Sequence, residues 1–170
     1  MPVSASSART AARSLSVDEA LERILARVKP LAPVSLDLLD VLGLTLAEDI
    51  VADRDVPPFR NSAMDGYAVR AADVASAPAK LRVVGDIAAG GTPKGSVGAG
   101  EAMRIMTGAP MPDGTDTVVR VEDTDNRTDT VTITAATKLG TSVRAAGEDL
   151  KRGETILRRG TTLRAAEIGV

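Results

Sequence analysis

The stretch that most constrains the fold is Pro57–Val69, which reads Pro-Pro-Phe-Arg-Asn-Ser-Ala-Met-Asp-Gly-Tyr-Ala-Val. It holds the only Phe and the only Tyr of the chain, which also lacks Trp, so the core has to be built from aliphatic side chains. Two prolines keep the start of the stretch extended, and Asp65-Gly66 favours a turn. The pattern predicts a tight loop whose polar side chains, Asn61, Ser62 and Asp65, belong to a functional site.

The missing residue types limit the chemistry of this 170-residue chain. It has no Cys, which excludes disulfides, thiolate metal sites and a thiol nucleophile, and no His, which excludes Ser-His catalysis and the usual zinc ligands. Carboxylates, hydroxyls, backbone amides, Lys, Arg and an oxygen-bound metal such as Mg²⁺ are left. The net charge of −2 gives no basic face for nucleic acid, and no apolar run is long enough to cross a bilayer.

The first part of the chain predicts a tail followed by helices. Residues 1–14 are rich in Ser, Ala and Arg, which predicts a disordered tail and only faintly resembles a transit peptide. A capping box at Ser16 and Glu19 starts a helix that Pro30 ends. Ser35 is a candidate cap for a second short helix through Leu42, with Gly43 as its terminator.

The rest of the chain predicts short strands, with a polar hairpin turn at 125–129 and a flexible glycine-rich connection at 90–100. Such strands favour a small barrel or sandwich over βαβ units. A further helix starts near Thr162 without a stop signal, which predicts that the chain is part of a longer protein. The expected strands are 44–52, 81–88, 102–107, 117–123, 130–135, 142–146 and 155–159.

Two further turns follow predicted strands and carry candidate functional groups. Thr107-Gly108 places a hydroxyl and successive amides at a strand end, where they can bind an anion or simply close an ordinary turn. Gly147-Glu148-Asp149 offers two carboxylates that can hold Mg²⁺ or form a solvated turn. Taken singly, each turn leaves both interpretations open.

Together these motifs resemble the molybdopterin molybdenumtransferase family (MoeA-type), whose relatives include the C-terminal domain of gephyrin. The resemblance rests on residues 57–69, on Gly-Glu-Ala-Met-Arg-Ile-Met-Thr-Gly-Ala-Pro-Met-Pro-Asp-Gly-Thr-Asp-Thr-Val-Val at 100–119, and on Arg-Ala-Ala-Gly-Glu-Asp-Leu at 144–150. Residues 160–169, Gly-x-x-Leu-x-x-Ala-Glu-Ile-Gly, continue it. Long runs in the family's order, over about residues 15–170, are more specific than any one short motif.

The resemblance implies a cytoplasmic enzyme of molybdenum cofactor biosynthesis, which inserts molybdate into adenylylated molybdopterin, releases AMP and uses Mg²⁺. It assigns Asp65, Thr107 and Asp149 to the catalytic site, with Asp65 and Asp149 as candidate Mg²⁺ ligands. Thr107 and its amides would hydrogen-bond an oxyanion. The substrate-binding residues would be Asn61, Ser62 and Gly108.

The resemblance also implies an architecture and an assembly. The fold class is α+β, mainly β, with an elongated helix-containing part (15–46 plus 146–170) and an inserted small β-barrel-like domain (47–145). Family members resemble homodimers whose cleft needs a further pterin-binding domain, so residues 1–170 alone are expected to be inactive. Arg60 stands where the family commonly has Asp or Asn. A non-catalytic dimerisation or scaffold module and a generic oxyanion-binding domain are the alternatives.

Overall fold

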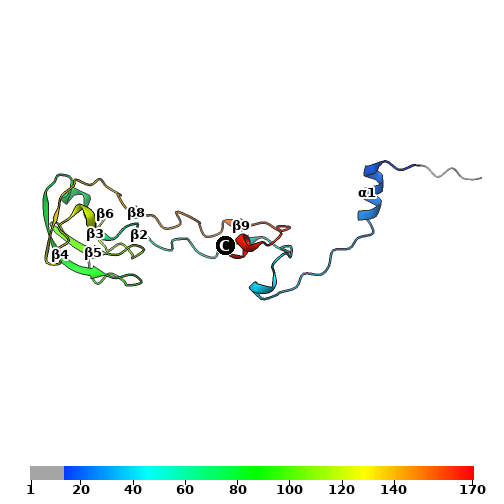
Figure 1. The fold of residues 1–170 in the computed structure, drawn as a ribbon, viewed down its shortest axis with the longest axis horizontal. Helices are drawn as coiled ribbons and strands as arrows, with labels where there is room; N and C mark the ends of the chain where they lie inside the picture. The colour runs from blue at the N-terminus through cyan, green and yellow to red at the C-terminus, as the bar shows by residue number, and fades with distance from the viewer. Residues whose placement is uncertain (1–13) are drawn as a thin grey trace, which may run out of the picture. The chain divides into compact units, whose positions relative to one another are not determined.

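The structure, a computed structural model, describes residues 14–170 and divides into two units, one ending at Val41 and one covering Leu42–Val170 (Figure 1). The predicted tail, residues 1–14, lies outside the described residues except for Ser14. Strands outnumber helices in the described part, so the prediction of a mainly β fold is confirmed. None of its helices is long and apolar enough to span a membrane.

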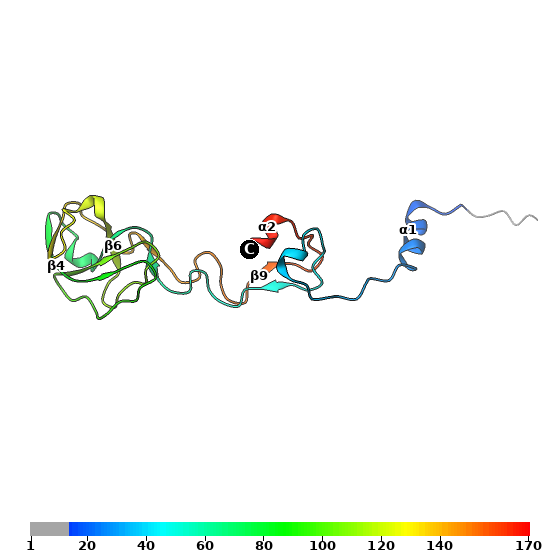
Figure 2. The same cartoon turned by 60° about the horizontal axis from the view of Figure 1, so that its bottom comes forward.

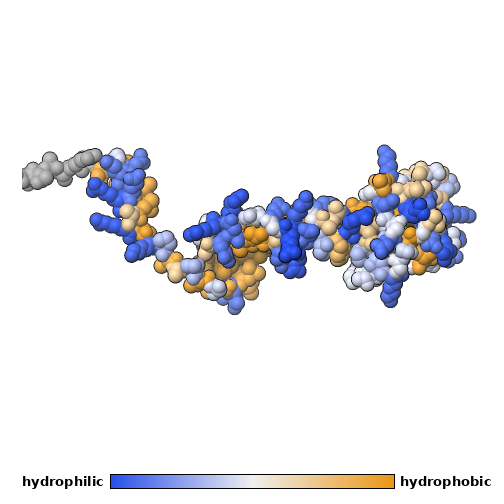
Figure 3. Space-filling view, turned by 180° about the vertical axis from the view of Figure 1, so that it is seen from behind, coloured by the Kyte–Doolittle hydropathy of each residue, from blue (hydrophilic) through white to orange (hydrophobic). Residues whose placement is uncertain are grey.

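Residues 14–41, the described part of the first unit, contain the α-helix α1 (Val17–Leu25), and its predicted capping box is present. The Ser16 hydroxyl accepts a hydrogen bond from the Glu19 amide at 3.1 Å, and the Glu19 carboxylate accepts one from the Ser16 amide at 2.9 Å. The apolar stripe of α1 is exposed, as the orange band along one side of the helix shows (Figure 3). The predicted second helix is wrong: only a 3₁₀ turn, η1 (Leu38–Asp40), forms, and no side chain caps it.

The second unit is built around a curled sheet with the strand order β6-β3-β5-β4-β7. Neighbouring strands are antiparallel except β4 and β5, which are parallel and joined by the predicted glycine-rich connection. Short 3₁₀ turns, η2 (Ala71–Asp73) and η3 (Val121–Asp123), follow β3 and β6. The strands are β3 (Gly66–Val69), β4 (Ala79–Ile87), β5 (Glu101–Ile105), β6 (Thr117–Arg120) and β7 (Thr130–Ile133).

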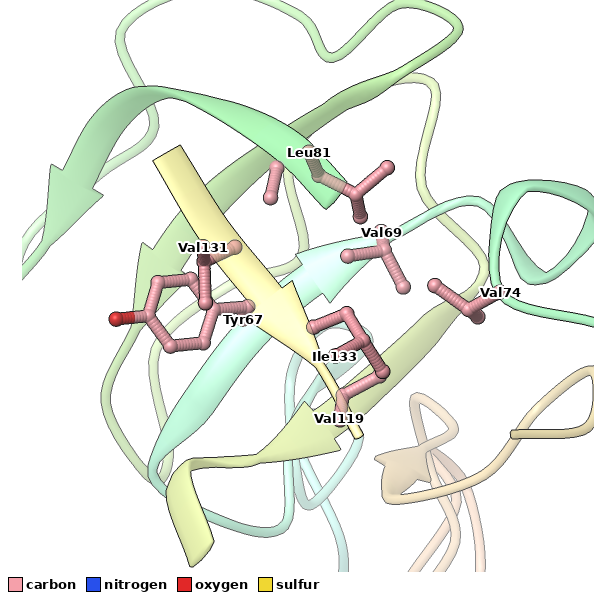
Figure 4. Close-up of a cluster of buried hydrophobic side chains, with 8 residues drawn as sticks. Tyr67, Val69, Val74, Leu81, Val119, Val131 and Ile133 are labelled. Atoms are coloured by element: carbon pink, nitrogen blue, oxygen red, sulfur yellow. The ribbon is translucent and has the colours of Figure 1, made fainter. Parts of the chain in front are cut away.

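Hydrophobic side chains cover both faces of this sheet. On one face, Tyr67 lies fully buried among branched aliphatic residues (Figure 4). Its hydroxyl, which points away from this cluster, donates a hydrogen bond of 2.9 Å to the carbonyl of Arg127. The other face packs Ala68 and Met103 against the glycine-rich connection and the turn after β5. The members of the first cluster are Tyr67, Val69, Val74, Leu81, Ala102, Val119, Val131 and Ile133.

The structure corrects the interpretation of Pro57–Val69 as a single loop. Its second half is β3, which pairs with β5 on one side and β6 on the other, so all four of its residues are buried. Asp65-Gly66 marks the entry to a central strand rather than a tight turn. Tyr67 therefore belongs to the core, and only Phe59 contributes exposed aromatic surface.

The predicted hairpin across residues 125–129 is also wrong as a strand pairing. β6 and β7 lie at opposite edges of the sheet, and β7 pairs with β4 instead. The turn itself exists, because the Thr132 amide donates to the Asp125 carboxylate at 2.9 Å and Thr124 forms a bridge with Ile133. The intervening η3 moves the chain away from β6 before it returns.

Two short strand pairs join segments of the second unit that are distant in the sequence. β1 (Ile50–Val51) pairs with β9 (Thr155–Leu157), and β2 (Asn61–Ser62) pairs with β8 (Val143–Arg144). Between these pairs the two chain segments run side by side, with the Val56 amide donating to the Leu150 carbonyl at 2.8 Å (Figure 2). The final helix, α2 (Ala165–Ile168), begins after Arg164 rather than at Thr162.

The predicted domain boundaries, 46/47 and 145/146, stay a prediction. β1 lies inside the range expected for the inserted domain, whereas its partner β9 lies outside that range. The predicted strand 44–52 is shorter than expected and is limited to β1 and a single bridge between Thr45 and Thr162.

Candidate functional site

The closest contact among the predicted site residues joins Asp65 to Thr107. Asp65 immediately precedes β3 and Thr107 follows β5, and these strands pair antiparallel with Gly66 opposite Ile105. One carboxylate oxygen of Asp65, Oδ1, accepts hydrogen bonds from both the amide and the hydroxyl of Thr107, each at 2.7 Å. The sheet register therefore fixes an exposed carboxylate at one end of the sheet.

This contact keeps Asp65 ionised. The hydroxyl and then the amide of Thr107 lower the pKa of Asp65, and the positive charge of Arg104 lowers it further. Since the folded-state pKa is below the unfolded value, this pair stabilises the fold above the unfolded pKa of about 3.9. That stabilisation is lost as the pH falls through the folded-state pKa.

Removing the Thr107 hydroxyl with Thr107→Val is expected to raise the pKa of Asp65 toward its ordinary value, because the largest cause of the lowering disappears. A carbon-detected NMR titration of the carboxyl groups measures this directly. Asp125, whose pKa is lowered by Thr132 on the opposite part of the sheet, is the internal reference and should not move. An unchanged Asp65 pKa in Thr107→Val would contradict this assignment.

The strand β2 links the Thr107-Gly108 turn to the loop that carries Asp65. The Gly108 amide donates to the Ser62 carbonyl at 2.8 Å, and the Ser62 amide donates to the Ala109 carbonyl at 3.0 Å. The Ser62 hydroxyl bonds within the loop, donating to the Met64 carbonyl at 2.5 Å. Backbone hydrogen bonds thus bring Ser62 and Gly108 together. They connect the Thr107-Gly108 turn to the loop that carries Asp65.

Asn61 is buried beside this link with one side-chain atom unsatisfied. Only 7% of the residue is exposed, and its Oδ1 has no hydrogen-bond partner among the described residues. Asn61 lies opposite Arg144 in the β2–β8 pair and forms a bridge with Pro110. A buried acceptor without a partner costs free energy.

Asp149 belongs to a separate hydrogen-bond network on the other side of β2. Its carboxylate accepts a hydrogen bond from the Arg144 guanidinium at 2.5 Å, and its amide donates to the Val56 carbonyl at 2.9 Å. Arg144 also contacts the Glu148 carboxylate at 3.3 Å. The contacts of Asp149 connect it to the site through Arg144 and Asn61 rather than directly to Asp65.

Arg144 contacts both Glu148 and Asp149, and the sequence interpretation did not single it out. The available signal was a cation in a short strand, four and five residues before the two carboxylates of the Glu148-Asp149 turn. Arg60 makes a different contribution: its carbonyl accepts a hydrogen bond from the Met111 amide at 3.0 Å.

The described residues fit Mg²⁺ only in part. They contain no group of three acidic side chains arranged to hold a metal ion. Mg²⁺ bound to a phosphate-bearing substrate needs just one or two carboxylates, and Asp65 can provide one because the Thr107 donors engage only its Oδ1. At Asp149, the guanidinium of Arg144 already occupies the place of a cation.

Comparison with known proteins places this chain in a family. The family model of the MoeA N-terminal region (domain I and II) matches residues 15–170. Molybdopterin molybdenumtransferase 2 of Mycobacterium tuberculosis is 39% identical over 159 residues, covering 91% of this chain and 39% of the relative. The molybdopterin molybdenumtransferase of Synechococcus elongatus is 40% identical over 156 residues, covering 88% of this chain and 39% of the relative.

Solved structures give the same result. A structure of the molybdopterin biosynthesis MoeA protein of Pyrococcus horikoshii matches with a TM-score of 0.80 at 32% identity, covering 92% of this chain and 41% of that one. The chain thus spans about two fifths of the length of the relatives it matches. The chain belongs to the family of MoeA N-terminal regions, that is, domains I and II of MoeA proteins.

Proposed function

We propose that this chain is the N-terminal region of a molybdopterin molybdenumtransferase, which inserts molybdate into adenylylated molybdopterin and releases AMP. The observation that carries the proposal is the Asp65–Thr107 pair, fixed at the end of the sheet in a chain whose relatives bear that enzyme's name. Membership of the family and a fixed, ionised carboxylate support the same activity.

In this proposal Asp65 is the reactive carboxylate and Thr107 holds it. Both donors of Thr107 are directed to Asp65, and the Gly108 amide is bonded to Ser62, so these groups are not free to bind an oxyanion. The expected role of Thr107 therefore changes from oxyanion donor to the residue that orients and ionises Asp65. Ionised Asp65 can accept a proton or a hydrogen bond from substrate or water.

Mg²⁺ would bind Asp65 together with substrate oxygens, and when bound it would neutralise phosphate charge. Asp149, held by Arg144, would position the segment that follows β8. The proposal includes an elongated part with an inserted barrel-like domain, a cytoplasmic homodimer, and a cleft completed by a pterin-binding domain beyond this chain. The exposed apolar stripe of α1 is consistent with such an assembly.

The proposal predicts that residues 1–170 alone turn nothing over, because they hold part of a site. Molybdate-dependent release of AMP from adenylylated molybdopterin, followed by chromatography, should be seen with the full-length protein and be absent with the isolated chain. Release by the isolated chain would refute the shared cleft, and no release by the folded full-length protein would refute the function.

A dimerisation or scaffold module is the second candidate, because a surface-exposed apolar helix face is typical of a protein interface. It differs from the first in its response to Asp65 substitution, since assembly through α1 does not need that carboxylate.

A further inference from the structure

Arg104 lies beside the Asp65–Thr107 pair, at the same end of the sheet. It stands opposite Tyr67 of β3 and opposite Asp86 of β4. Side chains alternate along a strand, and directly opposite residues share a face, so Arg104 lies on the same sheet face as Tyr67. Its charge contributes to the lowered pKa of Asp65, after the two Thr107 hydrogen bonds, which agrees with this proximity.

A surface hollow of about 420 Å³ opens next to Arg104. This size suits part of a small-molecule ligand, since ligand pockets typically occupy roughly 300–1,000 Å³. The hollow combines one cation, one anion, a hydroxyl and apolar wall, a mixture that can orient a polar group. Its lining residues are Val83, Gly85, Asp86, Arg104 and Thr128.

The Arg104 guanidinium is only loosely paired within the described part of the chain. Its Nε lies 4.0 Å from Asp86 Oδ1, which is beyond hydrogen-bonding distance, and about a third of the Arg104 side chain is exposed. Arg120, at the same end of β6, instead donates to Asp123 at 2.9 and 3.1 Å. Arg104 thus keeps guanidinium donors available in a planar arrangement that matches an oxyanion.

The neighbouring backbone donors are already in use. The Thr107 amide and hydroxyl bond to Asp65, the Gly108 amide bonds to Ser62, and the Ala109 amide donates to the Met106 carbonyl at 3.0 Å. An anionic substrate group placed next to Asp65 would meet a negative charge without a free amide to offset it. A cation has to supply that attraction.

We propose that Arg104 is a substrate-binding residue that holds a tetrahedral oxyanion of the substrate in this hollow. The oxyanion is a phosphate group of the adenylylated substrate or the molybdate dianion, which share charge and shape. This inference rests on the proposed function, because that function supplies the anionic substrates. Asp86 faces Arg104 from β4, and its negative charge weakens the binding of an anion. The anion has to compete with Asp86 for the Arg104 guanidinium.

The test is a titration of the isotope-labelled chain with AMP, orthophosphate or molybdate, following the Arg104 Nε–H signal by NMR. We expect that signal to shift and saturate, with the ligand that binds most tightly identifying the source of the oxyanion. An Arg104 signal that stays unmoved by all three overturns the inference. Movement confined to the Thr107 and Gly108 amides also overturns it, because the anion would then bind at those amides instead of at Arg104.

Variants of the full-length protein give an independent readout. Arg104→Gln should weaken binding of the responding anion by about tenfold or more, because a charged hydrogen bond is lost, and Arg104→Lys should restore part of it. Arg82→Gln is the matched control, because it removes the same charge at a different place in the sheet. Arg82 lies in β4, four residues before Asp86, and pairs with Glu101. Equal weakening in Arg104→Gln and Arg82→Gln would indicate a general charge effect and overturn the inference.

Binding and turnover separate this inference from the proposed function. If Arg104→Gln leaves anion affinity unchanged while Asp65→Ala abolishes turnover, the oxyanion site is wrong and the enzyme assignment stands. If anions bind at Arg104 but the full-length protein turns nothing over, the function is wrong and the anion site stands.

Discussion

Asp65→Ala in the full-length protein is expected to slow molybdenum insertion by about 10²–10⁴-fold, the range typical for loss of a group that assists proton transfer. The carboxylate is held by two hydrogen bonds from Thr107 and its pKa is lowered, so it is ionised at neutral pH. Asp65→Asn keeps the shape of the side chain and removes its charge. A similar loss in Asp65→Asn would show that the charge, rather than the contact with Thr107, is required.

Asp53→Asn is the matched control for Asp65→Asn. Asp53 is an exposed aspartate that pairs with its neighbour Arg54 at 2.8 Å, so its substitution removes the same charge away from the site. Its rate should stay close to that of the unmodified protein. A folded Asp65→Ala protein with normal turnover would exclude a catalytic role for Asp65.

Gly66→Ala is expected to be the most destabilising small substitution in the sheet. A Cβ at residue 66 would lie 1.9 Å from the Val119 carbonyl oxygen, and that atom belongs to the backbone of the adjacent strand. The strands β3 and β6 would have to separate at the position where Gly66 lies opposite Arg120. We expect a loss of about 3 kcal/mol in the free energy of unfolding, the upper end of the usual cost of overpacking, measured by urea denaturation.

Gly85→Ala is the matched control, because Gly85 lies in β4 of the same sheet. Its added Cβ would meet only the flexible side chain of Met103, at 3.3 Å and beyond. The expected change is within about 1 kcal/mol, since a methionine side chain can adjust. Equal stability of the Gly66→Ala and Gly85→Ala proteins would contradict the close approach of β3 and β6.

The loss in Gly66→Ala also bears on function. Gly66 follows Asp65 directly and lies opposite Ile105, two residues before Thr107. A shift of β3 at this point would move the carboxylate away from its donors. Local chemistry at Asp65 thus depends on the absence of a side chain at the next residue.

The sequence was sufficient to predict the features that depend on local chemistry. The capping box at Ser16 and Glu19 and the strands near residues 81–88 and 130–135 formed as expected, because their signals lie within a few neighbouring residues. Gly43 adopts the positive φ expected of a helix terminator, although only the 3₁₀ turn η1, and no α-helix, comes directly before it.

The predictions that were wrong concern features that depend on partners distant in the sequence. Gly66–Val69 was interpreted as loop because four residues are too few to show alternation, and only pairing with β5 and β6 makes them a central strand. The hairpin prediction paired β6 with β7 because these strands follow each other in the sequence. The sheet places β7 beside β4 instead.

In the candidate site, too, local sequence predicted some features, and contacts between distant residues determined the others. The motifs made Asp65 and Thr107 candidate site residues. They did not show that both donors of Thr107 bond to Asp65, because that contact depends on the register of β3 and β5. Arg104 was not predicted as a candidate site residue either. One signal could have found it: a charged residue inside an otherwise apolar strand, Ala102–Ile105.

The most direct test of a single Asp65–Thr107 unit is a double-mutant cycle on the rate of molybdenum insertion, with Asp65→Ala, Thr107→Ala and the double variant in the full-length protein. Residues that act as one unit give strongly non-additive losses, so the double variant should be about as slow as Asp65→Ala alone. Losses that multiply would contradict the unit, and so would full activity in both single variants.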